Sequence, residues 1–231
     1  MLSGGAADWF AFDLKLFYQD EDQLSIFHLF SRPFEAETQT FVLVGLGNPG
    51  REYRQTRHNV GFMVIDELCK ELNVRLTRMQ GKAMVGSGVL KGSKIILAKP
   101  QTFMNLSGQS VASLVKFYKV PFNQLLIILD DLDLPVGTLR IRPDGGSAGN
   151  KGLMSIIQQL GTEEFPRMRL GIGRPPGQKN GADYVLQDFQ NGEMDFVKEV
   201  LSKASQAAQV FINYGIDQAM NQFNGPLDRE Y

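Results

Sequence analysis

The spacing of apolar residues becomes regular at Phe41 and predicts alternating strands and helices from that point onward. The run Phe41–Val44 is wholly apolar and precedes a glycine turn, as expected for a buried strand. From Asn59 to about Leu72 the apolar residues recur at the spacing of a helix that packs on one side. These two segments predict a β-loop-α unit.

Further strands and helices alternate along the rest of the chain. We predict strands over Ala83–Leu90, Lys94–Lys99, Leu125–Leu129, Thr138–Arg142 and Met168–Gly173, and helices over Ser107–Tyr118, Gly152–Leu160 and Met194–Tyr214. Strands without polar positions belong to a sheet that helices cover on both faces. The sequence therefore predicts an α/β protein, a single-domain three-layer α/β/α fold with a mixed, mostly parallel central sheet.

In the first 40 residues, the apolar side chains recur neither at the two-residue spacing of a strand nor at the 3.6-residue spacing of a helix. The acidic run Asp20–Asp22 argues against a plastid or mitochondrial transit peptide, because such peptides are poor in acidic residues. An additional packing segment and a misassigned start codon are the alternatives. We predict an N-terminal extension over residues 1–40, with a role that the pattern does not reveal, and one folded domain over residues 41–231.

The net charge changes sign at the same boundary, between residues 40 and 41. The net charge of the whole chain is −1, but residues 1–40 hold two basic and seven acidic side chains, which leaves 22 basic and 18 acidic side chains and a net charge of +4 for the remainder. A weakly basic domain can hold RNA through a local cluster of Lys and Arg, because affinity for phosphate depends on where these residues gather.

Cysteine content and apolar run length indicate the compartment. Cys69 is the only cysteine, so one chain can build neither a disulfide nor a thiolate metal site. The longest apolar runs, such as Leu125–Leu129, are far shorter than the ~20 residues that span a bilayer. We expect a soluble protein with no membrane partner, located in the cytoplasm, or in an organelle stroma or matrix if the source is eukaryotic.

The glycine turn after the first strand matches a dinucleotide-binding motif, but the helix and the acidic residue that this motif also requires are missing. Gly45–Gly50 reads G-x-G-x-x-G and follows a strand. That pattern requires a helix to begin at the glycines and an acidic residue at the end of the next strand. Here Pro49 and the polar stretch Arg51–Arg57 delay the helix, and the nearest acids, Asp66 and Glu67, lie within it. We therefore expect no nucleotide cofactor.

The candidate chemistry rests on a histidine and an aspartate. His58 lies in the loop between the first strand and its helix, and Asp130 follows the buried strand Leu125–Leu129. A neutral imidazole is a common general base, and a carboxylate that accepts its second N–H fixes the tautomer. The carboxyl end of a strand is where such sheets present functional groups. The alternatives are a solvated loop histidine and a capping aspartate.

Two loops supply candidate amide groups. Asn48, between the glycines of the first turn, can donate to a carbonyl oxygen or to an attacking water, although Asn is also common in turns for conformational reasons. In the loop Lys99–Gly108, Asn105 or Ser107 is the expected N-cap of the next helix. No set of His, Cys, Asp and Glu has the spacing of metal ligands, so we expect no metal.

Four motifs, in this order and spacing, resemble the bacterial peptidyl-tRNA hydrolase family. They are Gly45–Gly50, Thr56–Gly61, Thr102–Gly108 and Asp130–Pro135, and Leu170–Pro175 adds a fifth. The resemblance runs from about Phe41 to Phe223. It implies a monomer that binds peptidyl-tRNA and hydrolyses the ester between peptide and tRNA without metal or cofactor. The long helix around Phe196–Phe211 would cover the sheet and the cleft.

The same resemblance assigns roles to individual residues. His58 would be the general base that activates water, Asp130 its partner, and Asn48 the amide that positions the water or the carbonyl. Met104 and Asn105 would contact the peptide, and Asn150 and Lys151 would be further contacts with the substrate. Residues that would hold the tRNA match family positions near the cleft mouth and the RNA groove, namely Tyr53, Arg140, Arg142 and Arg169. The alternative for the arginines is an ordinary solvated strand edge.

One loop departs from the family pattern. Where the family usually reads Gly-Gly-His-Asn-Gly, this chain has Asn150 in place of the histidine and Lys151 in place of the substrate-binding asparagine. A lysine keeps a donor but loses the acceptor and the planar amide. This departure leaves open a second hypothesis, a family member with weak or no turnover that acts in RNA binding or splicing, as plastid intron-splicing factors of the family do.

Overall fold

Eight strands form one mixed sheet. The computed structural model describes residues 38–175, 177, 180–190 and 192–227, so most of the predicted extension over residues 1–40 lies outside the described residues. The sheet has the order β2-β3-β4-β1-β5-β7-β6-β8. The strands span Thr40–Gly45 (β1), Arg78–Gln80 (β2), Ala83–Leu90 (β3), Ser93–Pro100 (β4), Leu125–Asp131 (β5), Thr138–Arg142 (β6), Arg167–Gly171 (β7) and Gly225–Pro226 (β8).

The parallel strands lie at the centre of the sheet. β1 pairs in parallel with β4 and β5, and β5 pairs in parallel with β7. The flanking strands β2 and β3 on one side, and β6 and β8 on the other, join by antiparallel pairing. The mixed α/β sheet is thus confirmed, with its parallel part confined to four neighbouring strands. Their carboxyl ends meet at one edge, which is where such sheets place their ligands.

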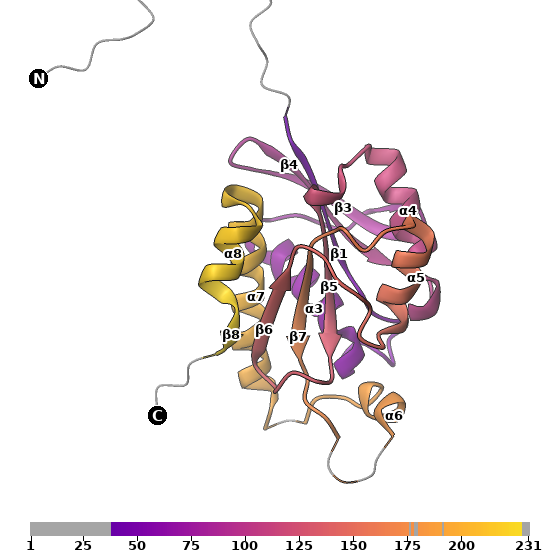
Figure 1. The fold of residues 1–231 in the computed structure, drawn as a ribbon, viewed down its shortest axis with the longest axis vertical. Helices are drawn as coiled ribbons and strands as arrows, with labels where there is room; N and C mark the ends of the chain where they lie inside the picture. The colour runs from indigo at the N-terminus through magenta and orange to yellow at the C-terminus, as the bar shows by residue number, and fades with distance from the viewer. Residues whose placement is uncertain (1–37, 176, 178–179, 191, 228–231) are drawn as a thin grey trace, which may run out of the picture. The chain divides into compact units, whose positions relative to one another are not determined.

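Helices cover both faces of this sheet, as Figure 1 shows. On one face lie α3 (Val60–Glu71), α7 (Met194–Tyr214) and α8 (Ile216–Phe223), and on the other lie α4 (Ser107–Tyr118) and α5 (Lys151–Leu160). The predicted three layers are confirmed. Short helical segments complete the described fold, namely η2 (Arg57–Asn59), η3 (Met104–Leu106), η4 (Phe122–Gln124) and α6 (Gly181–Val185).

Alternation of side chains along the central strands explains why Phe41–Val44 of β1 and Leu125–Leu129 of β5 are apolar without interruption. In β1, Phe41 and Leu43 join the core under α3 and α7, whereas Val42 and Val44 join the core under α4 and α5. Successive side chains of a strand point to opposite faces, so a strand between two helical layers has no position for a polar residue. The uninterrupted apolar runs in β1 and β5 are therefore a consequence of their burial on both faces of the sheet.

Every predicted strand and helix is present in the structure, and the ends differ by at most two residues. The strands β3 and β6 and the helices α4 and α7 have the predicted bounds. The short elements β2, α6, α8 and β8 were not predicted. The N-cap prediction for α4 was wrong: Leu106 is the N-cap and no side chain caps this helix, because the turn η3 leads directly into it.

A close approach of two glycines brings the loop after β1 to the end of β5. A Cβ atom added to Gly45 would overlap the carbonyl oxygen of Gly61, at the start of α3. One added to Gly61 would overlap the carbonyl oxygen of Ile128 in β5. Both positions therefore require glycine. This packing holds η2, which carries His58, against β5.

Within the described residues, no helix is long and apolar enough to cross a membrane.

Cys69, the single cysteine of the sequence, packs against the core, and its thiol is poorly reactive. Burial, and secondarily the charge of Asp66, raise the pKa of the Cys69 thiol to about 11, while Lys99 acts in the opposite direction. Only the thiolate is a good nucleophile, and an ordinary cysteine has a pKa of about 8.5. The thiol of Cys69 therefore stays protonated at physiological pH.

We expect Cys69 to react with iodoacetamide at pH 8 roughly a hundredfold more slowly than a free thiol, because that is the reduction in thiolate that the raised pKa produces. Mass spectrometry of the native protein over a pH series measures the rate. Asp66→Asn removes a charge that raises this pKa and should speed the reaction, whereas unfolding in urea should restore the rate of a free thiol. Equal rates in native and unfolded protein would contradict the assignment.

Candidate active site

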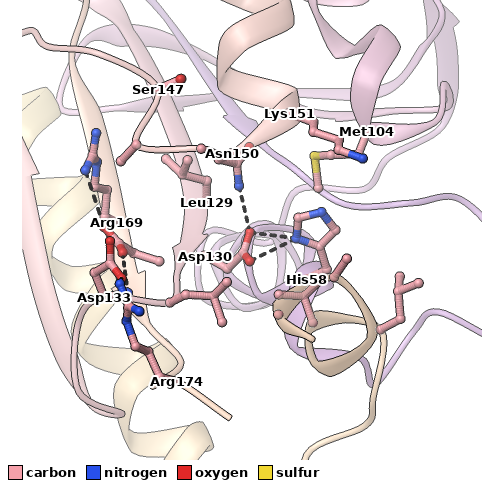
Figure 2. Close-up of a pocket in the computed structure, with 18 of the residues that line it drawn as sticks. His58, Met104, Leu129, Asp130, Asp133, Ser147, Asn150, Lys151, Arg169 and Arg174 are labelled. Atoms are coloured by element: carbon pink, nitrogen blue, oxygen red, sulfur yellow. Dashed lines mark hydrogen bonds and ion pairs between the residues drawn. The ribbon is translucent and has the colours of Figure 1, made fainter. Parts of the chain in front are cut away.

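His58 and Asp130 meet at the carboxyl edge of the parallel strands (Figure 2). His58 Nδ1 lies 2.9 Å from both carboxylate oxygens of Asp130. The Asp130 side chain is 4% exposed and the His58 side chain 14% exposed. A buried carboxylate here requires a donor, so the histidine carries its proton on Nδ1. Nε2 then remains as the acceptor on the cavity side.

A second donor reaches the same carboxylate from the start of α5. Asn150 Nδ2 donates to Asp130 Oδ1 over 3.0 Å. The Asn150 side-chain oxygen accepts the backbone N–H groups of Gly152 and Leu153, so Asn150 is also the N-cap of α5. Asp130 is thereby held by groups from two separate parts of the fold.

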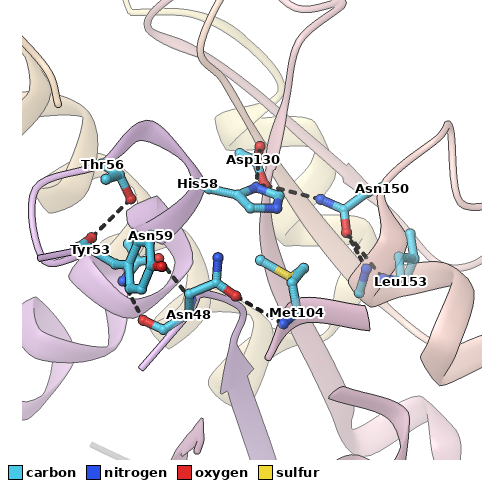
Figure 3. A network of polar contacts seen from close by, with 10 residues as sticks. Asn48, Tyr53, Thr56, His58, Asn59, Met104, Asp130, Asn150 and Leu153 are labelled. Atoms are coloured by element: carbon cyan, nitrogen blue, oxygen red, sulfur yellow. Dashed lines mark hydrogen bonds and ion pairs between the residues drawn. The ribbon is translucent and has the colours of Figure 1, made fainter. Parts of the chain in front are cut away.

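The Asn48 side chain is fixed with its amino group facing the histidine (Figure 3). Its Oδ1 accepts the backbone N–H of Met104 over 2.9 Å. The buried side chain of Asn59 holds the Asn48 backbone from both sides: Asn59 Oδ1 accepts the Asn48 N–H, and Asn59 Nδ2 donates to the Asn48 carbonyl. Since a backbone N–H can only donate, Oδ1 must face Met104 and Nδ2 must point the other way.

These three side chains share a cavity of about 810 Å³, and the predicted residues Met104, Asn105, Asn150, Lys151 and Arg169 line it too. The other walls come from Phe103, the end of β5 with Leu132 and Asp133, the loop Ser147–Gly149, and the segments Arg174–Pro175, Gly177, Gly181–Ala182 and Val185–Leu186. This volume lies in the range of pockets that bury a small organic ligand or a comparable part of a larger one.

The acidic side chains of the cavity are largely neutralised by arginines. Asp131 pairs with Arg169 at 3.3 Å, and Asp133 pairs with Arg174 at 2.5 Å. Lys151 is exposed and, among the described residues, no hydrogen bond or ion pair holds its ammonium group. Within the same part of the chain, no group of three His, Cys, Asp or Glu residues could hold a metal ion.

Three predicted residues lie outside this cavity. Tyr53 contributes its backbone carbonyl, which accepts from the Thr56 hydroxyl. Arg140 and Arg142 are exposed on β6, where Arg140 lies opposite Arg169 of β7. Together with Arg169 they place three arginines on these two neighbouring strands. Helix α7 packs on the sheet, as expected, and contributes none of the described residues that line this cavity; residues of the segment around α6 line it instead.

Arg57, which the sequence analysis did not single out, ties the histidine loop to this wall. Its side chain is 3% exposed and pairs with Glu193 at 2.6 Å. The guanidinium lies over the rings of Tyr184 and Phe189, 4.6 and 5.1 Å from their centroids, and donates to the Asp188 carbonyl. Its position beside His58 in the Thr56–Gly61 motif was the only signal in the sequence.

A second buried arginine anchors the loop that carries Asn150. Arg167 is fully buried and donates to the backbone carbonyls of Phe165, Gly145 and Glu163. Burial, and secondarily the charge of Arg169, lower the pKa of Arg167 to about 10, so the guanidinium remains charged at neutral pH. Carbonyl oxygens thus replace the water that this cation loses on burial.

A histidine oriented by a buried aspartate, at the carboxyl ends of parallel strands, is typical of hydrolytic enzymes of the α/β class. The family model described as peptidyl-tRNA hydrolase matches residues 42–230. This chain belongs to the peptidyl-tRNA hydrolase family.

Peptidyl-tRNA hydrolases of several bacteria are similar to this chain in sequence or in structure. The chain is 51% identical over 185 residues to a peptidyl-tRNA hydrolase of Thermoanaerobacter sp. (strain X514), covering 80% of this chain and 100% of the relative. It is 47% identical over 184 residues to one from Carboxydothermus hydrogenoformans, covering 80% and 98%. The crystal structure of the Acinetobacter baumannii peptidyl-tRNA hydrolase matches with a TM-score of 0.76 at 34% identity, covering 81% of this chain and 95% of that chain.

We expect Arg57→Met to destabilise the protein by about 2 kcal/mol, because it removes the cation that pairs with Glu193 and the side-chain donor to the Asp188 carbonyl. Limited proteolysis should then cut the segment 184–193 before the rest of the domain, and chemical denaturation gives the loss of stability. Arg75→Met, at an exposed position away from this contact, is the matched control. Unchanged stability and proteolysis in Arg57→Met would refute the role of this contact.

Proposed function

We propose that this protein hydrolyses the ester bond between peptide and tRNA in peptidyl-tRNA, and so recycles tRNA from stalled translation. The observation that carries the proposal is the joint presence of His58, Asp130 and the oriented Asn48 amide in one cavity of a peptidyl-tRNA hydrolase fold. Each supplies a different requirement of ester hydrolysis: a base, its orienting acid, and a donor for the carbonyl or the water.

The reaction follows from the atoms that face the cavity. A water molecule gives a proton to His58 Nε2 as its oxygen attacks the ester carbonyl, and Asp130 stabilises the imidazolium that forms. Asn48 Nδ2 donates to the oxygen on which negative charge develops. When the tetrahedral intermediate collapses, the ribose oxygen leaves and takes the proton from Nε2, which restores the neutral histidine. The products are a peptide carboxylate and a free tRNA 3′ end.

Substrate contacts divide between the cavity and the arginines of β6 and β7. Met104, Asn105 and Lys151 line the cavity beside the reacting groups and would contact the peptide. The side chains of Arg140, Arg142 and Arg169 on β6 and β7 would hold phosphates of the tRNA. Tyr53, which lies outside the cavity, would add a contact with the tRNA. We further propose that the protein acts as a monomer in the cytoplasm, without metal.

The second candidate function, RNA binding without turnover, rests on Lys151. Its ammonium group has no partner among the described residues, and by the family resemblance Lys151 takes the position of a substrate-binding asparagine. A phosphate could therefore be favoured there over a peptide amide. Purified protein that binds tRNA but releases no peptide would support this function in place of the first.

We expect His58→Ala to lower the release of a labelled N-acetyl-aminoacyl group from tRNA by roughly 10²- to 10⁴-fold, because the general base is lost. His28→Ala, which removes the chain's other histidine, should leave turnover unchanged. Circular dichroism verifies that both variants are folded. Equal turnover in the parent and His58→Ala would eliminate this mechanism.

We expect Lys151→Asn to lower the KM for peptidyl-tRNA several-fold, because an amide restores an acceptor for the peptide backbone at the cavity wall. Lys116→Asn, which removes the same charge from an exposed position of α4, controls for the general effect of charge on RNA affinity. A higher KM in Lys151→Asn would instead assign this lysine to a substrate phosphate.

A further inference from the structure

Asp130 receives hydrogen bonds from two elements that are distant in the sequence. His58 approaches from η2, and Asn150 approaches from the start of α5, 20 residues after the aspartate. The His58 ring nitrogen is equidistant from both carboxylate oxygens, but the Asn150 amide contacts Oδ1 alone. The two donors therefore constrain the carboxylate differently.

A single imidazole N–H leaves the carboxylate free to turn. The torsion that rotates an aspartate carboxylate has a broad energy profile, so one donor shared between two oxygens defines its plane poorly. A second donor on one oxygen removes this freedom, because rotation would break the bond to Asn150. The plane of Asp130, and with it the direction of the His58 ring, then depends on Asn150.

The Asn150 amide is itself held in one orientation. Its oxygen accepts from Gly152 N at 3.0 Å and from Leu153 N at 3.1 Å. A flipped amide would set its NH₂ group against these two N–H donors and its oxygen against the Asp130 carboxylate, which is unfavourable at both ends. Helix α5 thus directs the Asn150 amino group at Asp130.

We propose that Asn150 is a positioning residue that couples the N-terminus of α5 to the Asp130–His58 pair, and is not a substrate-binding residue. This inference rests on the proposed function, in which His58 is the base. The amide oxygen and one amino hydrogen of Asn150 are already committed within the protein. The neighbouring Lys151 is the side chain that this loop leaves free for substrate.

Three substitutions separate positioning from helix capping. Asn150→Asp and Asn150→Ser keep an oxygen that caps α5, but the first replaces the donor by a like charge and the second is too short to reach Asp130. Asn150→Ala loses both the cap and the donor. Asn221→Asp adds the same charge on the exposed surface of α8 as a control.

Steady-state hydrolysis of N-acetyl-aminoacyl-tRNA then distinguishes the roles. We expect kcat to fall roughly tenfold in Asn150→Ser, the size of effect that partners of oriented histidines have elsewhere, with KM within twofold of the parent and melting temperature retained. Asn150→Asp should lose at least as much kcat with a similar KM, and its like charge beside the buried Asp130 should also lower the melting temperature. Asn150→Ala should lose the same kcat and also melt earlier, and Asn221→Asp should match the parent. A change in KM with kcat intact, or full activity in Asn150→Ser, would overturn the proposal.

A spectroscopic measurement tests the same inference without turnover. The Nδ1–H proton of His58 should give a downfield NMR signal, assigned by its absence in His58→Ala and unaffected by His28→Ala. In Asn150→Ser it should broaden or vanish, because a freely turning carboxylate protects this proton poorly. If the parent hydrolyses nothing, the proposed function fails while this signal still decides the role of Asn150; an unchanged signal in Asn150→Ser would refute positioning.

Discussion

The hydrogen bond between His58 Nδ1 and the Asp130 carboxylate is the interaction on which the organisation of the cavity depends. Asp130 is almost fully buried and follows five apolar residues of β5, so its charge is tolerated only because donors reach it. The same requirement gives the histidine one tautomer and leaves Nε2 toward the cavity. A buried charge and an accessible base are thus two consequences of one contact.

The loops that bear these groups are held by buried cations and by close backbone packing. Arg57 binds the histidine loop to the segment that includes α6, and Arg167 binds the loop before α5 to the start of β7. Both use backbone carbonyls as acceptors, which lets a loop be rigid without regular secondary structure. The glycine pair at β1 and α3 adds the third constraint, because it brings the two parts of the site within contact distance.

The loop between β6 and α5 brings two neighbouring polar residues to the cavity. Asn150 contacts the Asp130 carboxylate and caps α5 at once. Lys151 lines the cavity, and among the described residues no hydrogen bond or ion pair holds its ammonium group. Substitutions at these adjacent positions should have different consequences, because the Asn150 side chain is engaged in the protein's own hydrogen-bond network.

The layers of the fold could be predicted from the sequence, since the strand and helix periods record burial on two faces or one. His58, Asp130 and Asn48 were candidate site residues because of their places after strands, and the structure brings them to one cavity. Short elements such as β2 and α8 escaped prediction because three to eight residues carry too little periodicity. Tertiary structure alone decided that Arg57 clamps the segment near α6, that Leu106 replaces a side-chain cap, and that Asn150 faces Asp130. Each of these depends on atoms from segments 20 or more residues apart or on the path of a turn, and local spacing contains no record of either.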